Sequence, residues 1–411
     1  MPEETILRQD LHDLIATFAR FGATDDGGVC RLSGTAEDKA ARDLFAGEIG
    51  GRGLRLDIDG IGNMFATAML NQASGDAVLV GSHLDSQPTG GRYDGVYGVL
   101  AGLLAAEAIV ARAAAEPGAA RRNLVVVNWT NEEGARFQPS LTGSSVFAGV
   151  QPLESALSLL DGDGQTLGDA LGAIGYRGAG ALTLTPRRYV ELHIEQGARL
   201  EESSTDIGIV AGAWAARKIS VVFEGEASHT GPMPMPRRRD ALRAAARGIE
   251  TLYDEVEQGA HASAARISLY PNSPNVVPSR AQVWFEIRHE DEKVTAAIAD
   301  RFLRRIGAAV APLGVTATIA IDEKRATAAL DPEGVKLVQS VAGDLGFTSL
   351  VMKTVAGHDA LALQKRVPAT LIFVPSRNGL SHNAREFTEP AALDKGLAVL
   401  IETLWRLVTA P

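Results

Sequence analysis

Apolar positions in the first half of the chain follow two spacings, one typical of helices and one typical of short buried strands. The helical spacing predicts helices over residues 3–21, 38–49 and 95–115. Short apolar runs predict strands over residues 54–58, 64–70, 77–80, 123–129 and 189–193. Because these strands alternate with helices, the pattern predicts an α/β unit with a large mixed sheet whose strands are mainly parallel.

The pattern changes after about Gly212. From there it predicts strands over residues 218–223, 281–289 and 315–321, and helices over 240–256 and 291–311. Few strands with two long helices are typical of a small α+β unit, in which helices cover an antiparallel sheet. Alternation resumes at about Asp331, with a strand over 371–374 and a terminal helix over 390–408. We therefore expect one larger unit in two parts, residues 1–212 and 326–411, with residues 213–325 inserted as a smaller unit.

Charge and cysteine content exclude several classes of protein. The 411 residues include 40 Lys and Arg and 50 Asp and Glu, which give a formal net charge of −10. Nucleic-acid binding depends on many cationic contacts, so no nucleic-acid partner is expected. The single cysteine, Cys30, excludes an internal disulfide framework and a cysteine-rich zinc module.

The sequence also predicts no membrane partner. Its beginning lacks the basic and apolar segments of a signal peptide, so we expect a cytoplasmic protein. The apolar stretch over residues 95–115 contains Glu107 and Arg112 and many small residues, which favours a buried helix over a membrane span.

Histidines and acids recur at the ends of predicted strands, and further ones follow in the loops. The residues that could bind metal at one edge of the sheet are His83, Asp94, Glu132, Glu133, His193 and His382. A single histidine at a strand end is more often structural, but this recurrence indicates a site, because ligands bind beyond the carboxyl ends of parallel strands. Imidazole and carboxylate suit two ions of zinc, manganese, cobalt or nickel, and the Asp94 carboxylate could bridge them.

The spacing leaves some roles open. Either Glu132 or Glu133 could bind a metal while the other acts as general base. Asp85 is placed to accept the second ring N–H of His83 and so fix its orientation. The motifs of a serine hydrolase elbow, a P-loop and a dinucleotide-binding loop do not occur.

Four segments carry a specific resemblance. They are residues 81–95 (GSHLDSQPTGGRYDG), 128–134 (NWTNEEG), 191–197 (ELHIEQG) and 381–383 (SHN). They resemble the M20 metallopeptidase-like amidases, and more narrowly the hydantoinase/carbamoylase branch. The similarity extends over nearly the whole chain. His193 itself favours the amidase branch, because M20 peptidases commonly have Asp at that place.

The resemblance implies roles for individual residues. It makes His83, Asp94, Glu133, His193 and His382 the ligands of two metals, with Asp94 bridging, Glu132 the general base and Asp85 the orienting residue. Glu195 is then not a ligand. Residues near the substrate would be Gln196, Asn275, Arg288, Gly357 and His358. Arg288 would bind a substrate carboxylate, and His229 would stabilise the oxyanion in a neighbouring subunit. The segment over 354–356 departs from the usual family pattern, so the resemblance does not decide the identity of the substrate.

The implied protein is a cytoplasmic homodimer whose inserted unit serves as a lid and dimerisation domain. The implied reaction is hydrolysis of N-carbamoyl-L-amino acids to amino acid, ammonia and carbon dioxide. The alternatives are a β-ureidopropionase, an allantoate amidohydrolase, or a dipeptidase or N-acyl amino-acid hydrolase on the same scaffold. A non-catalytic binding protein is a more remote alternative, because binding alone needs no general base such as Glu132.

Overall fold

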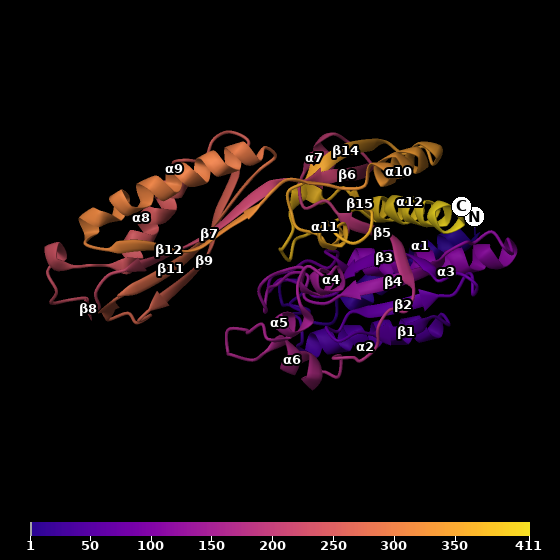
Figure 1. The fold of residues 1–411 in the computed structure, drawn as a ribbon, viewed down its shortest axis with the longest axis horizontal. Helices are drawn as coiled ribbons and strands as arrows, with labels where there is room; N and C mark the ends of the chain where they lie inside the picture. The colour runs from indigo at the N-terminus through magenta and orange to yellow at the C-terminus, as the bar shows by residue number, and fades with distance from the viewer. Residues whose placement is uncertain (1) are drawn as a thin grey trace. The chain divides into compact units, whose positions relative to one another are not determined.

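The computed structural model describes the backbone of residues 2–411 and the side chains from Leu7 onward. The chain divides into two compact units, the larger made of residues 1–211, 330–352 and 356–411 and the smaller of residues 212–329 and 353–355 (Figure 1). The smaller unit is therefore an insertion. It also includes a short return segment, residues 353–355, that the hydrophobic pattern does not reveal.

A nine-stranded sheet forms the centre of the larger unit. Its strands run in the order β1-β2-β4-β3-β5-β15-β6-β13, and β14 pairs with β6. Their bounds are β1 (Arg55–Ile58), β2 (Met64–Ala68), β3 (Asp76–His83), β4 (Asn123–Trp129), β5 (Thr185–Ile194), β6 (Ile207–Ala213), β13 (Ala328–Ala329), β14 (Ser349–Thr354) and β15 (Ala369–Val374).

The strands at the centre of the sheet are parallel. Strands β4, β3, β5 and β15 are parallel neighbours. The pairs β1–β2, β2–β4, β15–β6 and β6–β13 are antiparallel. The predicted mixed α/β sheet is confirmed, and the expected parallel pairing is found among β4, β3, β5 and β15 but not in the four antiparallel pairs. Because those four strands point the same way, their carboxyl ends meet at one edge.

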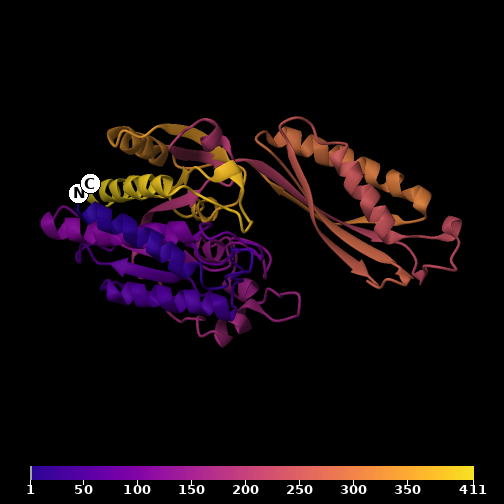
Figure 2. The same ribbon diagram turned by 180° about the vertical axis from the view of Figure 1, so that it is seen from behind.

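Helices cover both faces of this sheet. The helices of the larger unit are α1 (Pro2–Phe18), α2 (Ala36–Gly51), α3 (Val96–Ala115), α4 (Thr142–Phe147), α5 (Leu153–Leu157), α6 (Leu167–Ala173), α7 (Arg199–Glu202), α10 (Pro332–Asp344), α11 (Asp359–Leu363) and α12 (Pro390–Thr409). Helices α3 and α12 pack together on one face, and α4 and α11 pack together on the other. Figure 2, turned by 180°, shows α12 in yellow and α1 and α2 in indigo from behind.

Helix α3 is a core helix, as predicted. Among the described residues it alone has the length and apolar composition of a membrane span, with a mean hydropathy of 1.7. Val99, Leu103 and Ile109 on this helix are fully buried and belong to the core of the larger unit. Its burial by protein accounts for its apolar composition.

The smaller unit is a four-stranded antiparallel sheet with two long helices on one face (Figure 1). Its sheet order is β12-β7-β11-β9, with β7 (Ala215–Glu224), β9 (His261–Tyr270), β11 (Arg280–His289) and β12 (Thr316–Arg325). The helices are α8 (Ala241–Tyr253) and α9 (Glu292–Val310). A two-stranded sheet pairs β8 (Ser228–His229) with β10 (Val276–Val277). The predicted α+β insertion is confirmed.

Candidate active site

The central parallel strands bring the predicted histidines and acids to one edge of the sheet. His83 ends β3, and His193 lies one residue before the end of β5. Glu132 and Glu133 follow β4, and Asp94 lies in the loop before α3. Since β4, β3 and β5 are adjacent and parallel, their polar ends must lie side by side.

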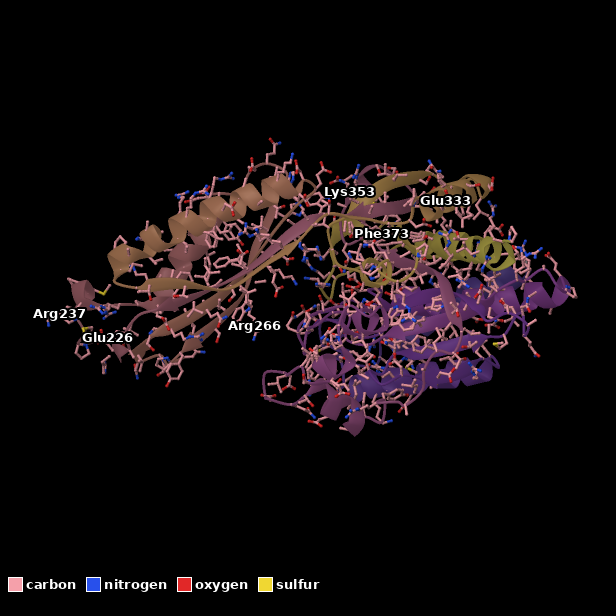
Figure 3. The ribbon with its side chains drawn as sticks, viewed as in Figure 1. Glu226, Arg237, Arg266, Glu333, Lys353 and Phe373 are labelled. Atoms are coloured by element: carbon pink, nitrogen blue, oxygen red, sulfur yellow. The ribbon has the colours of Figure 1, made fainter. Side chains whose placement is uncertain are left out.

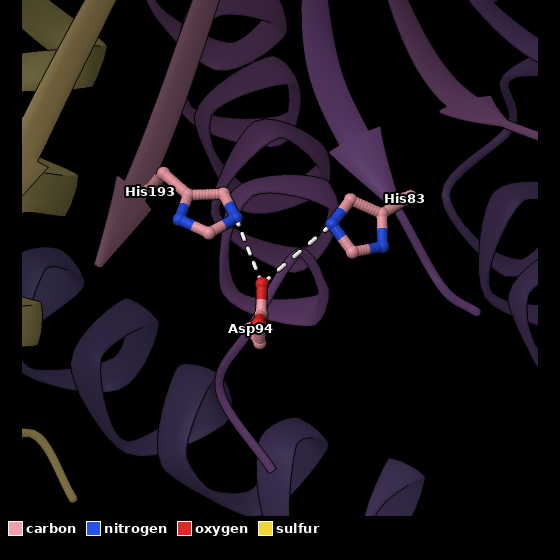
Figure 4. A group of neighbouring side chains, drawn as sticks. All are labelled: His83, Asp94 and His193. Carbon is pink, nitrogen blue, oxygen red and sulfur yellow. Dashed lines mark ion pairs between the residues drawn. The ribbon is translucent and has the colours of Figure 1, made fainter. Parts of the chain in front are cut away.

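Asp94 stands between two groups of side chains. Its Oδ1 is 3.1 Å from His193 Nε2 and 3.7 Å from His83 Nε2 (Figure 4). Its Oδ2 is 3.3 Å from His382 Nε2, and that nitrogen is 3.4 Å from Glu133 Oε2. Each oxygen of Asp94 therefore faces a different set of potential metal ligands, as a bridging carboxylate requires.

Both sets are compact enough to hold an ion. The ligand atoms of His83, Asp94 and His193 lie within 4.8 Å of one another, and so do those of Asp94, Glu133 and His382. These are the five residues to which the resemblance assigns metals. Glu132 belongs to neither set, and its Oε2 lies 3.5 Å from His83 Nε2. The geometry thus separates the two adjacent glutamates, which the spacing alone could not do.

The loop that carries Asp94 needs a glycine. Gly95 has φ +67°, and a Cβ there would lie 2.4 Å from Cε1 and Nε2 of the His83 ring. Any other residue would be strained and would push against His83. The backbone nitrogen of Gly95 also lies 3.1 Å from His193 Nε2, so the loop contacts both histidines.

Burial and crowding change the protonation of the acids. Burial and then the charge of Asp94 raise the pKa of Glu133 to about 8, and burial followed by Asp359 raises the pKa of Glu132 well above its usual range. Burial alone would raise the pKa of Asp94, but hydrogen bonds from His193 and His382 hold it well below its ordinary value. Several carboxyl groups thus compete for few positive charges.

The histidines respond in two ways. Burial lowers the pKa of His83 to about 4, so its imidazole is neutral near pH 7. Burial also opposes the charge on His193 and His382, but contacts with Asp94 raise the pKa of each to about 9.

The donor set fits divalent metal ions. Glu133 Oε1 is buried and has no hydrogen-bond donor among the described residues, although its carboxyl group lies among other acids. A cation would offset the mutual repulsion of these acids and satisfy such an oxygen. Imidazole nitrogens with carboxylate oxygens, and no thiolate, are ligands of zinc, manganese, cobalt and nickel.

Asp85 contacts a different group from the one expected. His83 Nδ1 lies 2.9 Å from the backbone oxygen of Asp85, whereas the Asp85 carboxylate is 3.9 Å from that nitrogen. The carboxylate instead accepts the backbone N–H groups of Glu132 and Glu133, each over 3.2 Å. Its backbone orients His83, and its side chain holds the two glutamates, because the turn after β4 brings those N–H groups closer than the ring.

Glu386 supports Asp94 and was missed in the sequence. Its Oε1 accepts the backbone N–H groups of Tyr93 and Asp94 over 3.1 and 3.2 Å, and its Oε2 accepts Ser381 Oγ–H over 2.8 Å. Burial and the charge of Asp94 raise its pKa to about 7. Its place four residues after His382 was the available signal, but an isolated Glu in a loop is usually solvated.

Gln196 lies within the cluster itself. Its Nε2 is 2.9 Å from Asp94 Oδ2 and 3.4 Å from His382 Nε2. Glu195 has a structural role, since its carboxylate accepts the N–H groups of Arg199 and Leu200 at the start of α7. The ring of His358, which follows Gly357, packs edge-on against His193 with centroids 4.7 Å apart.

Glu191 completes a third group with His193 and His358, but its oxygens already have donors. Ser82 Oγ–H donates to one oxygen and the Ala360 N–H to the other, each over 2.8 Å. We therefore assign Glu191 to holding β3, β5 and α11 together rather than to a metal.

The predicted substrate residues of the smaller unit lie at two ends of its sheet. His229 pairs with Val276 across β8 and β10, and the Thr230 N–H donates to Asn275 O over 3.2 Å, so exposed His229 and Asn275 are neighbours. Arg288 lies near one end of β11, and Arg280, which follows β10 by three residues, lies at the other end. Eight strand residues span roughly 26 Å. Within one chain, His229 and Arg288 are thus far apart.

Known proteins are similar to this chain in fold and in sequence. The chain is 38% identical to the amidase of the hydantoinase/carbamoylase family from Burkholderia vietnamiensis, whose crystal structure matches with a TM-score of 0.92 and 98% of each chain covered. It is 36% identical to the N-carbamoyl-L-amino-acid amidohydrolase of Rhizobium meliloti, covering 92% of this chain and 90% of that protein. It is 33% identical to the allantoate amidohydrolase of Bacillus subtilis, covering 98% of each.

These likenesses and the buried donor set define a metal-dependent amidohydrolase. A model of the peptidase family M20/M25/M40 matches residues 79–406. The chain belongs to that family, and the resemblance read from its motifs is confirmed. Its relatives of known structure place it beside the hydantoinase/carbamoylase amidases.

Proposed function

We propose that this protein hydrolyses the carbamoyl C–N bond of N-carbamoyl-L-amino acids, giving amino acid, ammonia and carbon dioxide. The observation that carries the proposal is the position of Asp94, whose two oxygens face separate ligand sets beside a buried Glu132. The similarity to an N-carbamoyl-L-amino-acid amidohydrolase supports this choice of substrate.

In this proposal His83, Asp94, Glu133, His193 and His382 hold two metal ions. Bound there, the ions would supply Lewis acidity to a substrate carbonyl and to the attacking water. Glu132 accepts a proton from the water at a carboxylate oxygen and passes it to the leaving nitrogen. Asp85 holds Glu132 in place through the Glu132 backbone N–H.

The smaller unit would bind and orient the substrate. Arg288 donates to Glu286 and to the carbonyl oxygen of Val355. These two contacts fix the orientation of its guanidinium group, and its other N–H groups are left to bind a substrate. Arg288 binds the substrate carboxylate, while His229 and Asn275 act on the substrate of a partner subunit in a homodimer. The separation of these residues along β11 supports the partner's involvement. His229 then stabilises the oxyanion.

A second candidate is allantoate hydrolysis, favoured by similarity over 98% of the chain to an allantoate amidohydrolase. Allantoate also carries a carboxylate beside ureido groups, so Arg288 would bind its carboxylate and the same metal-binding edge would hydrolyse its ureido group. Residues 354–356 lie at the end of β14 and directly after it, and the carbonyl oxygen of Val355 among them accepts a hydrogen bond from Arg288. We propose that this segment distinguishes the two substrates.

The test is ammonia release by protein stripped of metal and reloaded with manganese, cobalt, nickel or zinc. The panel contains N-carbamoyl-L-amino acids, N-carbamoyl-β-alanine and allantoate. A dipeptide and an N-acetyl amino acid serve as comparison, and their cleavage is followed by the free amino acid released, because neither compound gives ammonia. We expect metal-dependent ammonia release to be fastest with an N-carbamoyl-L-amino acid. Faster turnover of allantoate would favour the second candidate, and cleavage of only the dipeptide or the N-acetyl compound would overturn both.

A further inference from the structure

One face of the four-stranded sheet in the smaller unit carries charged side chains. Helices α8 and α9 cover the other face, toward which Val221, Phe223 and Phe285 point. Side chains alternate along a strand, so Glu286 and Arg288 point away from those helices. We call this the open face. Arg266, labelled in Figure 3, lies on it with its guanidinium 4.5 Å from the centre of the Trp284 ring.

Two arginines flank one small residue on the open face. Arg325 on β12 is directly opposite Ala216 on β7, and Ala216 is directly opposite Arg288 on β11. Residues directly opposite in an antiparallel sheet point to the same face. The methyl group of Ala216 therefore leaves room for both guanidinium groups to approach the same space.

Two nitrogens of Arg288 already donate to acceptors within the protein. Its Nη2 donates to Glu286 Oε2 over 2.9 Å, and its Nη1 donates to the carbonyl oxygen of Val355 over 2.7 Å. These contacts fix the orientation of the Arg288 side chain. They also place one negative charge against it before any ligand binds.

Arg325 is different. Its Nε and Nη2 atoms are buried, and neither has an acceptor among the residues that the structure describes. Leaving charged donors buried without acceptors is costly, so such a pair points to a missing partner. Nε–H and Nη2–H form the edge of a guanidinium that takes both oxygens of one carboxylate.

The same unit shows this edge in use. On the opposite face of β7, Arg217 donates from Nε and Nη2 to the two oxygens of Asp322 over 2.7 and 2.8 Å. The Arg217 and Arg325 edges are chemically identical. Arg217 has a carboxylate supplied by the protein, and Arg325 has none among the described residues.

The charges around Arg325 favour one anion. Lys218 on β7 lies directly opposite Glu286 on β11 and directly opposite Glu323 on β12. Burial alone would raise the pKa of Glu286, but the Arg288 hydrogen bond and the charges of Arg288, Lys218 and Arg325 lower it, so the group is ionised. These neighbouring positions on the open face thus carry three cations, Arg288, Arg325 and Lys218. They carry two anions, Glu286 and Glu323, so one ligand carboxylate would balance the charge.

We propose that Arg325 is a carboxylate-binding residue, whose Nε–H and Nη2–H edge takes one carboxylate of the ligand beside the fixed guanidinium of Arg288. The identity of that ligand as a carbamoyl or ureido acid rests on the proposed function. The recognition itself rests on the unpartnered edge of Arg325. The rival explanation is a water molecule that bridges this edge to Glu286 Oε1, which also has no donor among the described atoms.

The first test observes Arg325 directly and needs no turnover. In ¹⁵N-labelled protein, the Arg325 Nε–H resonance is assigned by its loss in the Arg325→Lys variant. Sodium acetate is then added, with acetamide and sodium chloride as matched controls. We expect a saturable shift of this resonance with acetate and none with either control. No shift with acetate would leave the water bridge as the explanation and overturn the proposal.

The second test measures kinetics with the best carboxylate substrate of the ammonia assay. Arg325→Met should raise KM by about 10- to 100-fold while kcat changes little, because a charged bidentate contact is lost from binding. Arg325→Lys, which keeps the charge without the fork, should recover only part of this loss. The control is Lys324→Met, which removes a neighbouring charge from an exposed position on the other face.

The two proposals fail separately. An acetate shift without ammonia release from any carbamoyl or ureido acid would retain Arg325 as a carboxylate site and reject the proposed reaction. Ammonia release with unchanged KM in Arg325→Met, and no acetate shift, would retain the reaction and reject the role of Arg325. If Arg325→Met does not fold, the resonance and the Arg325→Lys kinetics still decide.

Discussion

At the scale of residues, the site depends on the different positions of the side chains of Glu132 and Glu133. Asp85 accepts the backbone N–H groups of both, while their side chains diverge toward different histidines. Glu132 approaches His83, and Glu133 approaches His382. A difference of one position along the chain thus becomes a difference in chemical role.

Glu132→Gln should therefore abolish turnover without removing metal. The amide has nearly the same shape but cannot accept a proton, so kcat should fall by at least about 100-fold. Metal content measured on the purified variant should stay at the wild-type value, since Glu132 belongs to neither ligand set. The matched control is Glu202→Gln, an exposed residue in α7, which should keep full activity. A Glu132→Gln variant near the wild-type rate would remove Glu132 from the role of base.

At the scale of elements, a buried ion pair attaches α2 to the larger unit. Arg42 Nε donates to Asp38 Oδ1 over 2.8 Å, and its other nitrogens reach Gly62 O and Thr130 Oγ1. Both charged side chains are almost completely buried, with 1% and 0% exposed. Asp38 also accepts the Gly34 N–H over 2.8 Å. These bonds join α2 to the loop before β2 and to the residue that precedes Glu132 by two positions.

Arg42→Met should destabilise the protein strongly, because it leaves Asp38 as a buried charge without its partner. The expected loss in free energy of unfolding is about 3–5 kcal/mol. Lys39→Ala on the same helix is the control. It breaks an ion pair with Asp43 whose side chains are 47% and 51% exposed, and such exposed pairs contribute about 0.2–1 kcal/mol. Urea unfolding midpoints of both variants, compared with wild type, check the contrast, and equal shifts would contradict it.

Other elements show where a hydrophobic pattern succeeds and where it does not. The pattern predicted α3, β4 and β11 because each has a continuous or regularly spaced buried surface. It did not predict β9 (His261–Tyr270), whose residues are mostly exposed on both faces. The short helices α4 to α6 were also missed, because one or two turns give no period to detect.

At the scale of the whole molecule, the proposed homodimer makes a prediction about shared sites. His229→Ala and Glu132→Gln protomers should each be inactive alone. Mixed dimers should regain one complete site, in which an intact Glu132 meets the partner's intact histidine. After full subunit exchange, activity should reach about one quarter of wild type, since half of the dimers have one of two sites complete.

Subunit exchange must be confirmed separately, for example by energy transfer between differently labelled protomers. Recovery of activity would place His229 in the partner's site. Absence of recovery after confirmed exchange would mean that His229 acts within its own chain or on neither site. A pair of variants in one site, Glu132→Gln with His83→Ala, is the control, because their mixed dimers have no complete site.

The amino-acid sequence by itself determined the α/β and α+β units, the family, and the group of residues at the metal-binding edge. It could do so because buried elements need a regular apolar period, and because the motifs that carry the chemistry are local strings such as residues 81–95 and 191–197. Tertiary structure alone decided the rest. Glu386 holds the backbone of Asp94, the side chain of Asp85 holds the two glutamates, and Arg325 stands beside Arg288. These relations join segments far apart in the chain, and strand register and burial, which no local pattern encodes, bring them into contact.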